Sequence, residues 1–235
     1  AIDFYINEGS TARIKEVKII GVTKFDENDL LSRLDLKPTS FMSWWNKDDR
    51  YSRQVLTGDL EKIRSFYMDR GYLDFDIENT TVSISETKKN VYIAIIIDEG
   101  NKYNFGDIKI SGKFYPLKEE SIFQNDIKTI KGEVFSRKLL NQSTESINQE
   151  LGNYGYAFSN VNPIPDVDKN NLTVGFNYFI EPGKKVYVRR ISFIGNEKTQ
   201  DKVLRREMRQ FESSYYDKEK IDQSTRRLKR TQYFE

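Results

Sequence analysis

The sequence predicts an α+β fold made of repeated units that each place two helices on a small mixed sheet. Three observations support this prediction. Segments of alternating apolar residues flank segments whose apolar residues recur every three or four positions, as in strands around amphipathic helices. The same order of elements returns along the chain. Of the 235 residues, 37% are hydrophobic and 13% are aromatic, which is enough to build compact cores despite 31% charged residues.

Each repeat begins with a strand that ends at a glycine. Two apolar residues alternate with polar ones before that glycine: Val17, Ile19 and Gly21; Ile108, Ile110 and Gly112; Ile191, Phe193 and Gly195. Another glycine, just after an acidic residue, precedes each strand: Gly9, Gly100 and Gly183. Because no long flexible linker separates the repeats, we expect a semi-rigid string that bends to a limited extent at these hinge glycines.

The first helix of the first repeat is predicted over residues 26–36. Asp26 is its expected N-cap, and three leucines spaced along the segment face inward. The corresponding helices of the next two repeats are expected at residues 119–128 and 199–210.

The second helix of each repeat ends near a Gly-Tyr pair. In the first repeat, four apolar residues fall on one helix face: Leu56, Leu60, Ile63 and Tyr67. Gly71 then suits the left-handed conformation that ends many helices. The second repeat ends its helix at Gly155 and Tyr156, whereas the third has Gln232 in place of the glycine.

A pair of strands completes the repeat. Residues 82–85 and 91–97 form this pair in the first repeat, and residues 172–180 form the last strand of the second. Residues 91–97 are apolar on both faces, which predicts a central strand. Each complete unit is therefore β-α-α-β-β, with both helices covering one face of a three-stranded sheet.

These landmarks resemble those of POTRA domains. The more specific features of the resemblance are Trp44-Trp45-Asn46, the helix end Asp69-Arg70-Gly71-Tyr72, and the run from Val203 to Gln210. The resemblance covers essentially the whole chain.

The resemblance implies a domain division. Residues 1–11 correspond to the last strand of a second POTRA domain, residues 12–100 to the third, and residues 101–184 to the fourth. Residues 185–235 correspond to a fifth domain that lacks its final two strands, because the pattern stops at Glu235 before any strand pair.

The resemblance also implies a function. It predicts a non-enzymatic scaffold on the periplasmic face of the Gram-negative outer membrane, ahead of a membrane β-barrel in the same full-length chain. The implied partners are unfolded outer-membrane proteins, bound by β-augmentation, and assembly lipoproteins, among them a BamD-like lipoprotein.

The hydrophobic phase locates a candidate peptide-binding edge in the first repeat. Phe75 and Ile77 occupy odd positions, whereas Val82 and Ile84 occupy even ones, and one strand face cannot hold both sets. Either a β-bulge at residues 78–81 resolves the change, or Phe75 and Ile77 precede the strand. The candidate edge comprises Ile77, Asn79, Thr80, Thr81, Val82, Ser83, Ile84 and Ser85.

The equivalent strand of the second repeat contains Pro163 and Pro165. Proline has no N–H to donate and is confined to edge strands or bulges. We therefore expect this strand to be an edge that accepts a visiting strand poorly. The contrast assigns β-augmentation to the first repeat.

Positive charge gathers in the last repeat, where residues 184–235 carry 15 basic and 8 acidic side chains, a net +7. A solvated helical face is one explanation, and a docking surface for an acidic partner or proximity to anionic membrane is another. The resemblance assigns the docking of a BamD-like lipoprotein to this repeat. Arg205, Arg209 and Glu212 would share a helix face and are the candidate contacts, although they could simply pair with one another.

The sequence gives little support for catalysis. It contains no Cys and no His, and it lacks phosphate-loop, dinucleotide and zinc-ligand motifs, so no enzyme activity, cofactor or metal is expected. The alternative function is a nucleic-acid-binding array of KH-like modules, which also place two helices after a strand. Neither complete repeat has the Gly-x-x-Gly loop that KH domains need, and both are acidic, so no nucleic-acid partner is expected.

Overall fold

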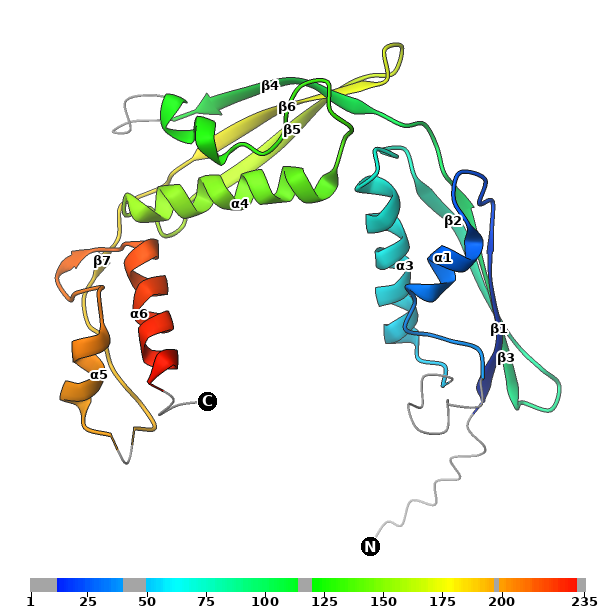
Figure 1. Cartoon of the computed structure of the whole chain (residues 1–235), viewed down its shortest axis with the longest axis horizontal. Coiled ribbons are helices and arrows are strands. Elements are labelled where there is room, and N and C mark those ends of the chain that lie inside the picture. Colours follow the sequence, from blue (N-terminus) through cyan, green and yellow to red (C-terminus); the bar gives the residue numbers. More distant parts are fainter. Residues whose placement is uncertain (1–11, 40–49, 114–119, 197–198, 232–235) are drawn as a thin grey trace, which may run out of the picture. The chain divides into compact units, whose positions relative to one another are not determined.

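The computed structural model describes residues 12–39, 50–113, 120–196 and 199–231 (Figure 1). The chain divides into two compact units. One comprises the described residues up to Tyr103 together with Val134–Arg137, and the other comprises the remaining described residues. Hinge residue Gly9, the expected strand at residues 1–11, Trp44 to Asn46 and Gln232 lie outside the described residues.

The first unit contains a mixed three-stranded sheet. Its strands are β1 (Arg13–Ile20), β2 (Asp76–Ile84) and β3 (Asn90–Asp98), in the order β1-β3-β2. β1 runs parallel to β3, and β2 runs antiparallel to it. The central place of β3 confirms the prediction made from its two apolar faces. Helices α1 (Glu27–Ser32) and α3 (Arg53–Met68) cover one face of the sheet (Figure 1).

The helix signals in the first unit are confirmed, although α1 is shorter than predicted. Asp26 caps α1 by accepting a hydrogen bond from the N–H of Asn28. The helix ends at Ser32 because the chain turns there to meet α3, where Asp59 accepts hydrogen bonds from the N–H groups of Asp35 and Leu36. Gly71 has φ +101°, as its predicted capping role requires.

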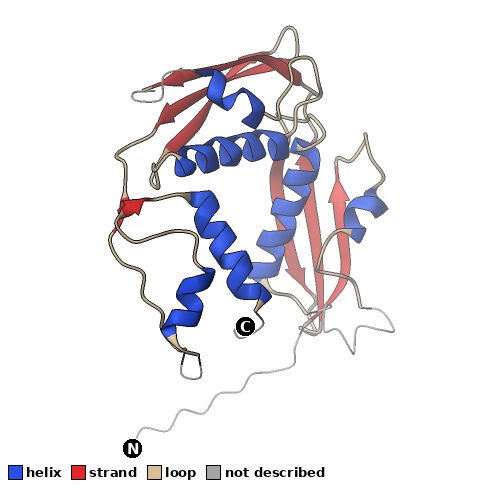
Figure 2. Ribbon diagram, turned by 60° about the vertical axis from the view of Figure 1, so that its left-hand side comes forward, coloured by secondary structure: helices blue, strands red, loops and turns tan. Residues whose placement is uncertain are grey.

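The second unit repeats the sheet. β4 (Asn104–Gly112), β6 (Thr173–Glu181) and β5 (Asn160–Asp168) lie in the order β4-β6-β5, and α4 (Arg137–Asn153) follows one face of the sheet (Figure 2). The prediction of an α-helix at residues 119–128 is wrong. This segment forms a 3-10 helix, η1, over Glu120–Asp126. Asn125 and Asp126 at its end compete with regular helical hydrogen bonding, which favours a short element.

The residues after 185 form β7 (Tyr187–Val188), α5 (Asp201–Glu207), β8 (Ser214–Tyr215) and α6 (Lys218–Arg230). Two predictions need correction. The first strand, expected to run through Ile191 and Phe193 to Gly195, is only two residues long, and it pairs with β8, for which no pattern was evident. The first helix, expected to reach residue 210, ends at Glu207.

In each repeat, a buried polar side chain on the second helix accepts a backbone hydrogen bond from the segment that follows the first helix. Asp59 caps the chain after α1, Ser143 accepts a hydrogen bond from the N–H of Lys128, and Ser224 accepts one from the N–H of Arg209. Each of the three side chains is at most 2% exposed. The bond from Arg209 to Ser224 explains why α5 stops early, since that N–H is no longer available to continue the helix.

Candidate peptide-binding edge and docking surface

The candidate peptide-binding edge is β2. Its register against β3 shifts between Ile77 and Asn79, which leaves Glu78 as the extra residue of a β-bulge. The bulge was predicted at residues 78–81 and is confirmed at the start of that interval. From Asn79 to Ile84 the pairing is regular, and within the described residues no strand pairs with the other side of β2.

The direction of the β2 backbone groups follows from one hydrogen bond. The N–H of Ser85 donates to the carbonyl of Asn90 over 2.9 Å. Antiparallel pairs alternate between hydrogen-bonded and non-hydrogen-bonded, so Ser83 and Thr81 also turn their backbone groups toward β3. The residues between them turn theirs to the outside of the sheet: Thr80, Val82 and Ile84.

The opposite edge of the sheet, β1, is partly covered by the chain itself. The carbonyl of Ile14 accepts a hydrogen bond from the N–H of Thr39 over 2.9 Å. The N–H of Ile19 donates to Oε1 of Glu27, also over 2.9 Å. Of the two edges of this sheet, β1 is thus partly covered by the chain's own groups, whereas no described segment pairs with the outer side of β2.

The prolines of the second repeat predicted an edge strand, and the structure confirms that position. β5 is an edge strand and pairs with β6 without any register shift. The buried side chains of β3 and β6 correspond one to one, which aligns the two sheets: Val91, Ile93, Ile95 and Ile97 with Val174, Phe176, Tyr178 and Ile180. In this alignment Pro163 takes the place of Thr80, and Pro165 takes the place of Val82. Two of the three outward donors of the first repeat, those of Thr80 and Val82, thus have no counterpart in the second.

Of the three candidate docking residues, Arg205 and Glu212 contact each other. The guanidinium of Arg205 contacts Oδ2 of Asp201 at 2.8 Å and Oε1 of Glu212 at 3.3 Å, and it donates to the carbonyl of Ile191 at 3.0 Å. Glu212 also accepts the N–H of Ile191 at 2.8 Å. Arg205 and Glu212 thereby hold both backbone groups of Ile191, in a stretch where the predicted strand has no ladder partner among the described residues.

The prediction that three residues share one helix face is wrong, because α5 ends at Glu207 and both Arg209 and Glu212 lie beyond it. The Arg209 guanidinium instead donates to the carbonyls of Arg206 and Met208. The pKa of Glu212 is lowered, first by the N–H of Ile191 and then by Arg205. The pKa of Arg205 is raised by its hydrogen bonds to Asp201 and Glu212. Both groups therefore stay charged at neutral pH.

The two described hinge candidates have positive φ, +63° at Gly100 and +75° at Gly183. A Cβ at Gly100 would lie 2.7 Å from Cβ of Asp74, so this position tolerates no side chain. Their role as hinges stays a prediction.

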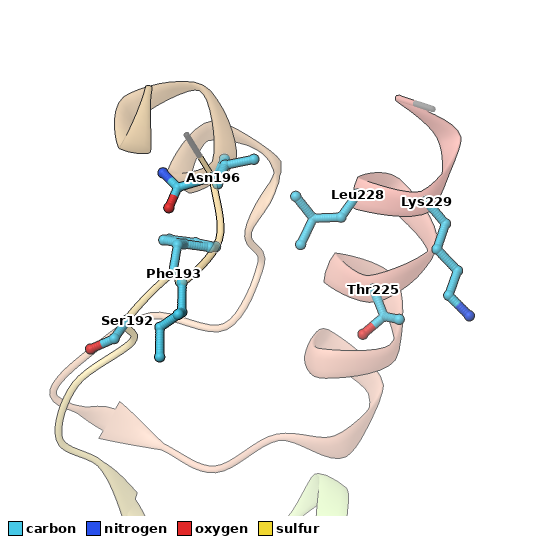
Figure 3. A pocket seen from close by; sticks show the side chains of 8 residues that line it. Ser192, Phe193, Asn196, Thr225, Leu228 and Lys229 are labelled. Carbon is cyan, nitrogen blue, oxygen red and sulfur yellow. The ribbon is translucent and has the colours of Figure 1, made fainter. Parts of the chain in front are cut away.

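A hollow of about 300 Å³ lies between the segment after β7 and α6 (Figure 3). Phe193 and Leu228 face it from opposite sides, and Thr225 and Lys229 line it from α6. In the first repeat the corresponding first strand, β1, is paired with β3. Ile194, next to this hollow, is 96% exposed.

The structure shows no helix long and apolar enough to cross a membrane in the part of the chain it describes. Among the same residues, no cluster of three or more Asp or Glu side chains has a geometry suited to a metal ion.

The repeated β-α-α-β-β units define the class of protein. The POTRA family, described as "Surface antigen variable number repeat", matches residues 12–100, 103–183 and 186–235. The chain therefore belongs to the POTRA family, as its landmarks predicted.

Two of the most similar relatives are outer membrane protein assembly factors. The chain is 33% identical over its whole length to outer membrane protein assembly factor BamA of Buchnera aphidicola, and 32% identical to BamA of Neisseria meningitidis. It spans 38% and 29% of the lengths of these relatives. The crystal structure of Haemophilus influenzae BamA POTRA3-5 matches 98% of this chain and is matched over 90% of its own length, with 26% identity and a TM-score of 0.81.

Proposed function

We propose that this chain is a non-enzymatic scaffold in the periplasm that takes part in outer-membrane protein assembly. In this proposal β2 binds unfolded outer-membrane proteins by β-augmentation, and the last repeat docks a BamD-like lipoprotein and other assembly lipoproteins. The names of the relatives support a part in outer-membrane protein assembly, and the POTRA fold supports the scaffold role. In this proposal the full-length protein also carries a membrane β-barrel.

The observation that carries the client-binding proposal is the outward backbone of Thr80, Val82 and Ile84. These groups offer a ladder to an extended polypeptide, and main-chain pairing demands little of the client's sequence. The bulge at Glu78 twists one end of the strand and limits the length of pairing, which protects the edge against open-ended aggregation.

An exchange of prolines between the two sheets tests this proposal. Thr80→Pro with Val82→Pro gives β2 the pattern of β5, and removes two outward donors while leaving the inward ladder intact. Pro163→Thr with Pro165→Val gives β5 the pattern of β2. We expect the first variant to lose binding of a peptide from an unfolded outer-membrane protein, and the second to gain a new binding site.

The readout is a titration followed by backbone amide shifts. Wild-type shifts should centre on residues 79–85 and those of the second variant on residues 160–168 as well. Circular dichroism checks the fold of each protein. Ser83→Pro is the contrasting single variant, because its N–H faces β3 and its loss should disturb the sheet itself. Unchanged affinity in a folded Thr80→Pro, Val82→Pro protein would overturn the proposal.

The docking proposal is supported by the charge of the last repeat and by the exposure of its ion pair, in which Arg205 and Glu212 are 43% and 38% exposed. Because these two side chains also hold Ile191, single substitutions would mix loss of docking with loss of local structure. The double exchange Arg205→Glu with Glu212→Arg keeps opposite charges adjacent but reverses their order. Arg209→Glu changes charge outside this network.

We expect both variants to bind a purified BamD-like lipoprotein more weakly than the wild type in a calorimetric titration. Lys169→Glu, an exposed reversal on the β5–β6 hairpin, is the control matched in net charge to Arg209→Glu, whereas the double exchange leaves the net charge unchanged. Equal weakening by Lys169→Glu would reduce the effect to long-range electrostatics and contradict a specific site at Arg205, Arg209 and Glu212.

A further inference from the structure

Two tyrosines whose tilted rings lie against each other mark a surface that the sequence patterns did not reveal. Tyr187 of β7 and Tyr215 of β8 are directly paired across the two-residue ladder, with ring centroids 4.1 Å apart. Both remain accessible, at 58% and 48% exposure. An exposed aromatic pair in a fixed arrangement offers a large flat contact area whose ordering on binding costs little.

Two cations flank the tyrosines. Lys185 and Arg189 flank β7, and with Tyr187 they are exposed in alternation with partly buried Val186 and Val188, the pattern of extended chain whose alternate side chains share a face. The ammonium of Lys185 lies 5.1 Å from the ring centroid of Tyr215. Within the described residues neither Lys185 nor Arg189 contacts a carboxylate. We call Lys185, Tyr187, Arg189 and Tyr215 the cation–tyrosine surface.

The backbone beneath this surface is held from both sides. The N–H of Val186 donates to the carbonyl of Gly155 over 2.9 Å. The carbonyl of Val186 accepts a hydrogen bond from the N–H of Tyr216, also over 2.9 Å. The carbonyl of Val188 accepts the N–H of Ser213 over 2.7 Å. The exposed side chains therefore project from a positioned strand rather than from a free loop.

We infer that the cation–tyrosine surface binds an acidic segment of a partner polypeptide that also carries aromatic or apolar side chains. Charge complementarity identifies the partner, since the surface presents two cations without carboxylates and lies in a region of net charge +7. The tyrosine pair adds an apolar platform with two hydroxyl groups at its rim.

A purely structural role explains only part of the cation–tyrosine surface. The stack of Tyr187 on Tyr215 stabilises the short β7–β8 ladder, and the contact of Lys185 with Tyr215 adds to it. Neither purpose requires Arg189, nor the lack of neighbouring carboxylates. The surface is also distinct from the Arg205–Glu212 network, whose charges are already matched, so the two can be tested separately.

The test uses the whole chain and a short fluorescent peptide that alternates glutamate with tyrosine. Two further peptides replace glutamate by glutamine or by lysine. Lys185→Glu and Arg189→Glu remove the attraction, Tyr187→Ala removes the platform, and Lys169→Glu is the control for net charge. Single-stranded oligothymidylate and vesicles of phosphatidylglycerol present anions of other classes. Circular dichroism and amide spectra check the fold of every variant.

We expect saturable binding of the glutamate peptide, amide shifts at residues 185–189 and 213–216, and affinity that falls as salt rises. Each reversal at Lys185 or Arg189 should weaken binding at least about threefold more than Lys169→Glu does. Several results would overturn the inference: equal binding of the glutamine peptide, shifts elsewhere, equal effects of Lys169→Glu, or tighter binding of the oligonucleotide or the vesicles than of the peptide.

Discussion

The phenol of Tyr67 donates a hydrogen bond of 2.8 Å to Oε1 of Glu99, and both side chains are buried. Tyr67 lies on α3, whereas Glu99 directly follows β3 and precedes the hinge candidate Gly100. The same carboxylate also accepts the N–H of Lys24 and the hydroxyl of Thr23, just after β1. One acidic side chain thus ties together the helix layer and the ends of two strands.

Removal of the Tyr67 hydroxyl should destabilise the first unit. In Tyr67→Phe the buried carboxylate of Glu99 loses one donor, at a cost of about 1–3 kcal/mol. Chemical denaturation followed by amide signals of β3 would measure this change. Tyr92→Phe, on the exposed face of the same sheet, is the control and should change stability by less than about 0.5 kcal/mol. Similar values for the two variants would contradict the role assigned to the Tyr67–Glu99 bond.

Glu99 should make the first unit sensitive to acid. Burial by itself would raise the pKa of Glu99, but the hydrogen bonds from Thr23, Lys24 and Tyr67 outweigh burial and lower it from 4.5. Because the folded pKa lies below the unfolded one, this contribution is present above pH 4.5 and disappears as the pH falls through the folded pKa. We expect the stability difference between wild type and Glu99→Gln to shrink as the pH falls below 4.5. A constant difference would refute this linkage.

Replacement of Asp59 by alanine should destabilise the end of α1, because the N–H groups of Asp35 and Leu36 lose their acceptor. The expected loss is about 1–3 kcal/mol. Asp59→Ser introduces the residue that the other two repeats use and should recover part of that loss. Thermal unfolding of the three proteins measures both effects, and an Asp59→Ser protein no more stable than Asp59→Ala would argue against a shared capping role.

Two glycine substitutions should act in opposite directions. Gly58 lies inside α3 with open space around it, so Gly58→Ala should stabilise the helix by about 0.5–1 kcal/mol. Gly21 has φ +102°, and a Cβ there would lie 2.1 Å from the carbonyl oxygen of Ile97, so Gly21→Ala should cost about 1–3 kcal/mol or more. Denaturant midpoints compare the two, and a neutral Gly21→Ala would mean that the ends of β1 and β3 separate easily.

Amide exchange should be faster after residue 185 than in the central strand of the first sheet. β3 is paired on both sides over most of its length, whereas β7 and β8 share a ladder of two residues. Hydrogen exchange followed by NMR would compare residues 187–188 with residues 91–97. Equal protection of the two strands would show that the last repeat is as stable as the first.

Local signals predicted much of the fold. The cap at Asp26, the left-handed Gly71 and the central place of β3 depend on neighbouring residues and on hydrophobic period, and all three are present in the structure. The phase change before Val82 located the bulge to within a few residues. Helix ends were predicted less well, because Asp59 and Ser224 stop α1 and α5 from a distant part of the chain.

The sequence by itself determined the repeated β-α-α-β-β order, the class of protein and the edge position of the proline-bearing strand β5, since period, glycine and proline act through local backbone geometry. Only the tertiary structure decided which amides of β2 face outward, because that depends on the register with β3. It alone placed Tyr187 against Tyr215 and Arg205 against Glu212, since neither contact follows from a local pattern. Such contacts form between segments that the fold brings together, where packing outweighs local preference.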